Sequence, residues 1–431
     1  MHLVHLTKFD LFIQITTILR RAFGSTRRFF CQLRLLFLGL LAMLVATSCA
    51  TDSKNPHHWN LWFYLNADNN LNEQILQDVV EITDGLQSDK LNVCILIDTL
   101  DDTAEQYCLS NNKKINRVEL GEIDMTQPAT LTNFLLWAKQ QGDAEQTMLV
   151  LSTHGNGWDQ QTGASPQNKL SARSMFVDET NRGTSRVILH NHSVADAIAQ
   201  ADVRLDILGL DASIMGTIEA LVEFADLADV LITSQETGHA SGWKYDDILS
   251  QLSTNSLMSH ESLAYVIVES YKTFYEAEVS DKRFTLAAHR SESIIELAET
   301  INNIASDLLV ELESNPDSIV DLLQTARADA QKIDPIVNPD VYIDLKDFLT
   351  HAGLLDDDVE QHFTNATIAE YHGDQRPQAN GISIVLFQDT TQITFDRHYT
   401  NWDAEAGVGN KGRFINEYLW DELIHAYYKT P

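Results

Sequence analysis

The sequence predicts an α/β protein in which a parallel sheet carries helices on both of its faces. Short, almost continuous apolar runs recur at residues 60–65, 91–97, 147–152 and 205–210. Runs of this length without polar alternation are typical of strands that are buried on both faces. Helical patterns separate these runs, and an alternation of strands and helices indicates a parallel sheet covered by helices. The length of 431 residues and the apolar content of 44% allow a sizeable core.

The first half of the chain, residues 59–258, carries this alternation and is the expected core. A helix is indicated where apolar residues recur at every third or fourth position from Leu71 to Leu86, and Asp68 or Asn69 can cap its start. A polar stretch at 105–120 is typical of a hairpin. The other elements expected in this half are helices at 131–140, 193–201 and 214–225 and a strand at 230–234.

The second half, residues 259–431, is expected to be a mainly helical part that packs on the core. Neither Asn338-Pro339 nor the acidic run at 356–358 marks a clean domain boundary. The expected helices cover about 262–278, 291–312, 318–331, 341–352, 356–371 and 414–428, and strand-like runs at 284–288 and 381–387 interrupt them.

Residues 1–48 have the composition of a targeting signal. Arginines precede a short apolar run at 35–45, which is too short to span a bilayer comfortably. Small residues and Cys49 follow, which resembles a bacterial lipoprotein cleavage site, although Ala46 stands where that site prefers leucine. We expect a lipid on Cys49 and a tether at 49–58, with an ordinary signal peptide as the alternative. This predicts a lipid-anchored protein of the cell envelope, in the outer membrane if the source is Gram-negative.

The net charge of −32 restricts the partners. So acidic a protein is a poor match for nucleic acid. It is also repelled by anionic membrane surfaces, so the lipid must provide the membrane attachment. A cationic substrate would be attracted, although much of the charge is expected to serve only as a solvated surface.

Two cysteines, Cys94 and Cys108, lie beyond the signal and the lipid site. Cys94 falls within the apolar run at 91–97, where a free thiol behaves as a small hydrophobic group. Outside the cytoplasm the two residues could instead form a disulfide. Neither lies near a histidine-bearing motif, and no Cys/His cluster has zinc spacing.

A turn from strand to helix at 211–213 is the first candidate for chemistry. The strand at 205–210 ends there, and helical spacing begins at Ile214. Ligands bind at the carboxyl ends of strands in open α/β sheets, and a hydroxyl such as that of Ser213 at a helix start lies beside N–H groups that can hold an oxyanion. The structural alternative is that Ser213 caps the helix and Asp211 complements the helix dipole.

His154 occupies a similar position after the strand at 147–152. Gly155 and Gly157 follow it, and glycines let the backbone approach a ligand closely. His154 is therefore a candidate base beside a backbone N–H donor, or else a turn residue in a glycine-rich loop. If the two strands are neighbours, His154 and Ser213 can form a dyad.

These segments and several others resemble the clostripain family of cysteine endopeptidases, which have the caspase-like fold. The resemblance covers residue 59 to the C-terminus. It implies a caspase-like parallel-sheet sandwich with a mainly helical C-terminal extension, and cleavage after Arg or Lys. The matching blocks are Trp-Phe-Tyr-Leu-Asn-Ala-Asp-Asn-Asn-Leu at 62–71, His-Gly-Asn-Gly-Trp at 154–158, Leu-Asp-Ala-Ser-Ile-Met-Gly at 210–216, Ser-Gly-Trp-Lys-Tyr-Asp at 241–246 and Asn-Gly-Ile-Ser-Ile at 380–384.

The resemblance assigns a role to each matching residue. His154 would be the general base, and the N–H groups of Gly155 and Ser213 would form the oxyanion hole. Asp211 matches the acid that lines the family's pocket for an Arg or Lys side chain, and a buried carboxylate suits a cationic guest. The expected partners are therefore basic peptide or protein segments. The residues that match a later block near the pocket are Trp243 and Asp246.

Ser213 stands where the family has its nucleophilic cysteine. A thiol ionises near pH 8.5, whereas a hydroxyl needs a well-oriented base. We therefore expect a pseudopeptidase that binds basic segments without cutting them. The alternatives are an active endopeptidase with Ser213 as nucleophile and His154 as base, and an engineered inactivation, against which the retained signal argues.

The loop at 159–186 is long, polar and rich in basic residues. In the clostripain family an internal basic site in this region is cleaved during activation. Lys169 matches by position, Arg173, Arg182 and Arg186 would serve equally, and a plain solvated loop is the alternative. The sequence itself indicates no cofactor, whereas the resemblance allows for calcium, which some relatives need.

Overall fold

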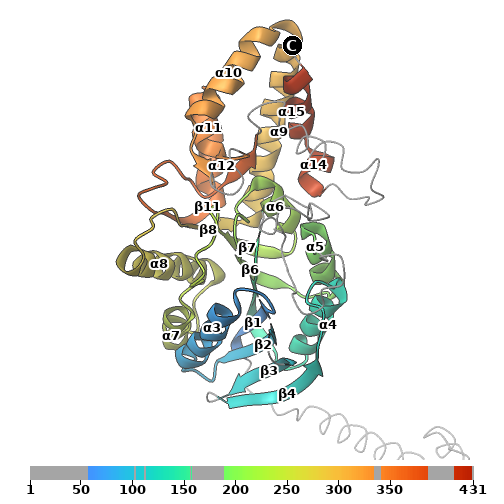
Figure 1. The fold of residues 1–431 in the computed structure, drawn as a ribbon, viewed down its shortest axis with the longest axis vertical. Coiled ribbons are helices and arrows are strands. Elements are labelled where there is room, and N and C mark those ends of the chain that lie inside the picture. The colour runs from blue at the N-terminus through green and yellow to red at the C-terminus, as the bar shows by residue number, and fades with distance from the viewer. Residues whose placement is uncertain are drawn as a thin grey trace, which may run out of the picture. The chain divides into compact units, whose positions relative to one another are not determined.

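A sheet of nine strands forms the centre of the protein in the computed structural model, which describes residues 57–100, 103–110, 113–155, 157, 189–333, 341–386 and 412–429 (Figure 1). The strands from β7 to β2 are parallel, and antiparallel strands extend the sheet at both edges. In spatial order the strands are β11 (Thr367–His372), β8 (Thr285–Arg290), β7 (Ala228–Thr233), β6 (Leu205–Asp211), β5 (Ala144–Ser152), β1 (His57–Ala67), β2 (Leu91–Thr99), β3 (Ala104–Ser110) and β4 (Lys113–Gly121).

Helices cover both faces of this sheet, so the predicted fold class is confirmed (Figure 1). Alternate side chains of β1 enter two separate cores, with Phe63 on one face and Tyr64 on the other. The first core also holds the apolar sides of α3 (Asn72–Gly85), α7 (Tyr245–Thr254) and α8 (His260–Glu278), and the second holds those of α4 (Pro128–Lys139), α5 (Asn191–Gln200), α6 (Ile218–Phe224) and α9 (Ser291–Ser314).

The part after residue 259 is less purely helical than expected. It supplies β8 and β11 to the central sheet, and residues 56–431 form one compact unit. It also forms a small antiparallel sheet in the order β12–β10–β9. Its remaining elements are α10 (Pro316–Asp329), β9 (Lys332–Ile333), β10 (Tyr342–Asp344), α11 (Leu345–His351), α12 (Asp357–Ala366), β12 (Ser383–Val385), α14 (Arg413–Glu417) and α15 (Trp420–Lys429).

Three of the helices predicted in this part are wrong in extent. The helix expected at 341–352 begins as strand β10, the helix expected at 356–371 ends at Ala366, and that expected at 414–428 is broken at Tyr418. Helical spacing continues through 367–371, but these residues pair with β8 instead. Their β-branched and aromatic side chains suit a sheet edge, so tertiary pairing overrides the local period.

Cys94 and Cys108 form a disulfide, which decides between the two alternatives left by the sequence. The two residues face each other in the antiparallel register of β2 and β3, with Cα atoms 4.0 Å apart. The bond ties the predicted hairpin, now β3 and β4, to the parallel strands. Among the described helices none has both the length and the apolar character needed to cross a bilayer. The targeting segment, Cys49 and Lys169 lie outside the described residues.

Candidate active site

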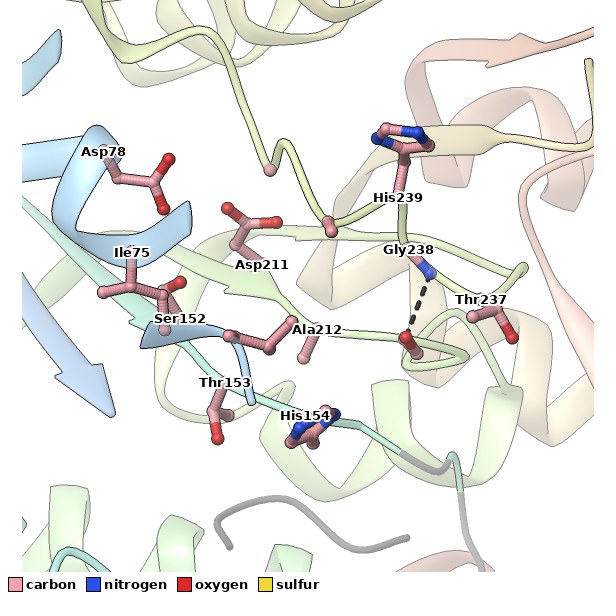
Figure 2. A pocket seen from close by; sticks show the side chains of 14 residues that line it. Ile75, Asp78, Ser152, Thr153, His154, Asp211, Ala212, Thr237, Gly238 and His239 are labelled. Carbon is pink, nitrogen blue, oxygen red and sulfur yellow. Dashed lines mark hydrogen bonds between the residues drawn. The ribbon is translucent and has the colours of Figure 1, made fainter. Parts of the chain in front are cut away.

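The carboxyl ends of β5 and β6 bring the predicted site residues together. The two strands are parallel neighbours, and Ser152 pairs with Asp211 in their register. His154 and Ser213 each lie two residues beyond their partner in that pair, so both reach the same edge of the sheet. They line a cavity of about 160 Å³, which Figure 2 shows. Its other lining residues are Leu71, Ile75, Asp78, Ser152, Thr153, Asp211, Ala212, Thr237, Gly238, His239, Ala240 and Gly242.

Ser213 lies in a strained loop and does not begin a helix. Helix α6 starts at Ile218, where the hydroxyl of Thr217 accepts a hydrogen bond from Ala220 N–H. Ile214 has a φ of 62°, a left-handed conformation that is unfavourable for a β-branched residue. The prediction of a helix start at Ser213 is therefore wrong, because Ile214 continues the apolar spacing without having helical backbone. The capping alternative for Ser213 and Asp211 is wrong for the same reason.

Backbone hydrogen bonds hold this loop in place. Ile214 N–H donates to the carbonyl of Glu236 at 3.0 Å, and Gly216 N–H donates to Ser234 at 2.8 Å, both just beyond β7. The carbonyl of Gly216 accepts from Ser383 N–H at 2.8 Å. Two other segments of the sequence, at 234–236 and at Ser383, thus fix the loop that carries Ser213.

Gly155 packs directly against the backbone of Ser213. A Cβ at Gly155 would lie 2.2 Å from the Ser213 carbonyl oxygen and 2.7 Å from its nitrogen. Only glycine fits such an approach. The two residues that the sequence assigns to an oxyanion hole are therefore adjacent, and the N–H groups come from loops, not from a helix start. The hydroxyl oxygen of Ser213 itself accepts a hydrogen bond from Gly238 N–H at 3.0 Å (Figure 2).

His154 is oriented by a residue that the sequence did not single out. Its Nε2 lies 2.9 Å from the side-chain oxygen Oδ1 of Asn70, at the start of the α3 region. An amide oxygen only accepts hydrogen bonds, so this contact places the proton on Nε2 and leaves Nδ1 as the basic nitrogen. The contact with Asn70 thus holds the imidazole ring of His154 in one orientation.

Asp211 lies partly buried at the side of the cavity. One of its oxygens, Oδ2, accepts hydrogen bonds from Tyr245 O–H at 2.8 Å and Trp243 N–H at 3.2 Å. Burial raises the pKa of this carboxyl to about 6, and these two donors partly oppose the rise. Asp211 is therefore a partly buried acid with one oxygen already engaged by the protein.

The other two residues expected near the pocket are placed differently. Trp243 contributes its backbone N–H to Asp211, but its indole is buried in the core, where a Cβ on Gly209 would lie 2.7 Å from it. Asp246 lies in the first turn of α7, and its Oδ1 is 3.5 Å from the ammonium of Lys244. Neither side chain lines the cavity.

Two groups of side chains among the described residues lie close enough to share a cation. The ligand atoms in each group are within 4.8 Å of one another. One group, all carboxylate, has the oxygen chemistry that calcium prefers, but calcium takes about six to eight oxygens. Three side chains do not supply such a shell, so no step of the chemistry is assigned to calcium. The groups are Asp68, Asp98 and Glu122, and Asp206, Asp229 and His260.

A histidine and a hydroxyl lie on adjacent strand ends, beside a partly buried acid and on a largely parallel sheet between two layers of helices, which is the arrangement that the resemblance to a caspase-like peptidase fold implies. The model of the clostripain family, Peptidase_C11, matches residues 63–427. The chain therefore belongs to the clostripain family.

Similar proteins agree with this assignment. Clostripain from Hathewaya histolytica is 24% identical over 248 residues, which are 50% of this chain and 46% of that protein, so the match spans about half of the relative's length. An inactive zymogen C11 protease from Parabacteroides distasonis aligns with 80% of this chain and 96% of its own, at 18% identity and a TM-score of 0.59. A secreted C11 cysteine protease from Bacteroides thetaiotaomicron, in complex with an irreversible peptide inhibitor, aligns with 80% of this chain and 98% of its own, at 17% identity and a TM-score of 0.60. At such identities the two structures confirm the fold alone.

Proposed function

We propose that this protein is a cell-envelope pseudopeptidase that binds Arg- or Lys-containing peptide segments beside Ser213 and cleaves them weakly or not at all. The observation that supports it is the partly buried carboxylate of Asp211 in the cavity that Ser213 and His154 also line. A buried acid is costly unless it is paired, so the cavity favours a cationic guest. The net charge of −32 adds a long-range attraction for basic segments.

Weak cleavage follows from the chemistry of the hydroxyl. If Ser213 occupies the nucleophile position, the attacking oxygen must lose its proton to His154 during attack, whereas a thiolate would already be formed. The oxygen of Ser213 also accepts a hydrogen bond from Gly238 N–H, which uses one of its lone pairs. An arrangement suited to sulfur is thus left with a poorer nucleophile, while the recognition of a basic side chain is retained.

An active serine endopeptidase is the second candidate, and one observation favours it. The contact between His154 Nε2 and Asn70 gives the base a fixed ring orientation, which a serine nucleophile needs more than a thiolate does. In this case Nδ1 of His154 would accept the Ser213 proton, and the adjacent N–H groups of Gly155 and Ser213 would stabilise the oxyanion.

Turnover of fluorogenic peptides with Arg or Lys before the reporter group decides between these functions. We expect little or no turnover by the wild type and clear turnover by Ser213→Cys, because the thiolate needs less help from the base. Ser213→Ala is the matched control for contaminating peptidases. Turnover by the wild type that His154→Ala abolishes would replace the pseudopeptidase by the serine peptidase. In that case mass spectrometry should also find the chain cut near Lys169.

A further inference from the structure

Asp78 is a second acid that lines the same cavity, and it is more deeply buried than Asp211. It lies on the apolar face of α3, between Ile75 and Ile82, and is 3% exposed. Figure 2 shows its carboxylate and that of Asp211 facing each other from α3 and β6. A Cβ on Gly242 would lie 2.8 Å from Asp211 Oδ2 and 3.5 Å from both oxygens of Asp78. The two carboxylates therefore border one small volume, which lies next to Gly242.

We propose that Asp78 and Asp211 together form a two-carboxylate subsite that selects the guanidinium of an arginine side chain over the ammonium of a lysine. This inference rests on the proposed function and deepens it, because it names the group that the cavity recognises and a second residue that determines specificity.

The geometry favours a guanidinium for two reasons. The two carboxylates come from different elements on different sides of the cavity, and the planar guanidinium has five N–H donors that can engage two acceptors at once. Asp211 has already committed Oδ2 to Trp243 N–H and Tyr245 O–H. A guest must therefore bind the remaining oxygen of Asp211 and reach Asp78 as well. The ammonium of lysine is more compact than a guanidinium, so it spans the two carboxylates less well.

Within the described part of the chain, no cation neutralises this pair. Lys244 is the cation that acts on Asp78, but its ammonium is engaged by Glu81 and lies 3.5 Å from Asp246. Glu81, one turn further along α3, adds negative charge. The hydroxyl of Tyr275 donates to the carbonyl of Gly242 and that of Tyr245 to Asp211, so both phenols face the pair without carrying charge.

Without a guest, two facing carboxylates in a buried site do not both ionise. Burial, together with the charges of Asp211 and Glu81, raises the pKa of Asp78 to about 9. The empty cavity therefore holds a proton on Asp78 near neutral pH. A guanidinium supplies the positive charge instead, so its binding should release that proton to the solvent.

Calorimetric titration of the mature protein with short blocked peptides tests the proposal. The peptides carry Arg, Lys or citrulline at one position, citrulline being the neutral analogue of Arg. We expect the Arg peptide to bind more tightly than the other two, and Asp78→Asn to weaken it by about tenfold to a hundredfold, the range for a hydrogen bond to a charged group. Titration near pH 7.5 in buffers of different ionisation enthalpy should show proton release by the wild type that Asp78→Asn loses.

Two control variants separate recognition from folding. Asp84→Asn removes an exposed carboxylate from the same helix and should leave affinity and proton release unchanged. Asp78→Glu keeps the carboxylate and should recover most of the Arg affinity. Equal affinity of the wild type for Arg and citrulline or for Arg and Lys, or unchanged Arg affinity in Asp78→Asn, would overturn the subsite. Failure of the wild type to bind any of the three peptides would instead overturn the proposed function.

Discussion

Asp211 and Asp78 show how the same residue type acquires different properties in one cavity. Burial raises the pKa of both carboxyls, to about 6 at Asp211, where hydrogen bonds from Tyr245 and Trp243 oppose the rise, and to about 9 at Asp78, where negative neighbours add to it. The sequence pointed to Asp211 through its position before Ser213. It also contains a signal for Asp78, which is an acid on the apolar face of an amphipathic helix. Only the folded chain shows that the two residues meet.

Replacement of Asp211 tests recognition separately from chemistry. Asp211→Asn should weaken binding of Arg-containing peptides by about 1.5–3 kcal/mol, the range for a hydrogen bond to a charged group. His154→Ala should weaken binding much less, because His154 contacts Asn70 and, in the function proposed above, serves proton transfer and not recognition. Calorimetry on both variants measures the difference. Unchanged affinity in Asp211→Asn would reduce Asp211 to a structural partner of Tyr245.

The raised pKa of Asp78 predicts how stability depends on pH. Its ordinary value is 3.8 and its folded value about 9, so the folded state binds more protons than the unfolded state between these values. The stability that this group contributes is complete below about pH 4 and is lost as the pH rises through 9. Asp78→Asn should remove this dependence and raise stability near pH 9 by roughly 1–3 kcal/mol.

Melting temperatures measured between about pH 5 and 9 check this expectation. Asp84→Asn, on the exposed side of the same helix, should follow the wild type throughout. A curve for Asp78→Asn that runs parallel to that of the wild type would show that Asp78 does not titrate in this window.

The loops after β5 and β6 carry the site, and their packing explains both a success and an error of the sequence-based prediction. Strands β5 and β6 form where apolar runs predict strands. Because the two strands pair, the loops that follow them lie side by side. The helix expected at Ser213 is wrong, because the period of apolar residues does not report the φ of 62° at Ile214. That conformation depends on Glu236, Ser234 and Ser383, which lie far away in the sequence.

Close contact between these two loops predicts a severe effect of one methyl group. In Gly155→Ala the new Cβ would lie 2.2 Å from the carbonyl oxygen of Ser213, so the loops must separate. We expect a loss of roughly 1–3 kcal/mol, as for an overpacked core. We also expect no gain of turnover when Gly155→Ala is combined with Ser213→Cys.

Gly238, which lines the cavity beside Ser213, provides the matched control. A Cβ at Gly238 would lie 3.7 Å from the Ser213 hydroxyl oxygen, an ordinary contact. Thermal denaturation should therefore show Gly238→Ala close to the wild type. Equal stability of the two alanine variants would mean that the two loops are less tightly packed than the structure indicates.

At the scale of the whole molecule, the C-terminal part completes the site from outside the parallel strands. Asp344 accepts hydrogen bonds from Gln235 Nε2 at 3.0 Å and from Asn380 N–H at 2.6 Å. Ser383 holds Gly216 in turn. Residues beyond 259 are thus part of the same compact unit that positions Ser213, which the predicted division into a core and a packed extension did not convey.

Attachment to a membrane is the prediction that concerns the chain as a whole. We propose that Cys49 carries a lipid, because an apolar run and small residues precede it. The protein should then be found in the membrane fraction, and Cys49→Ala should be soluble or remain unprocessed. Cell fractionation with sequencing of the mature N-terminus is the measurement. A wild type that is wholly soluble and begins elsewhere would contradict the proposal.

The sequence by itself determined the α/β class, the segments that form the parallel strands and the residues that lie at the ends of two of them. These features depend on local apolar runs and on residue types, which can be recognised within a single segment of the sequence. The tertiary structure decided that 367–372 is a strand, that Ser213 lies in a strained loop, and that Asp78 and Asn70 join the site. Each of these depends on contacts between segments distant in the sequence. Pairing partners and burial, not local spacing, therefore set their conformation and charge.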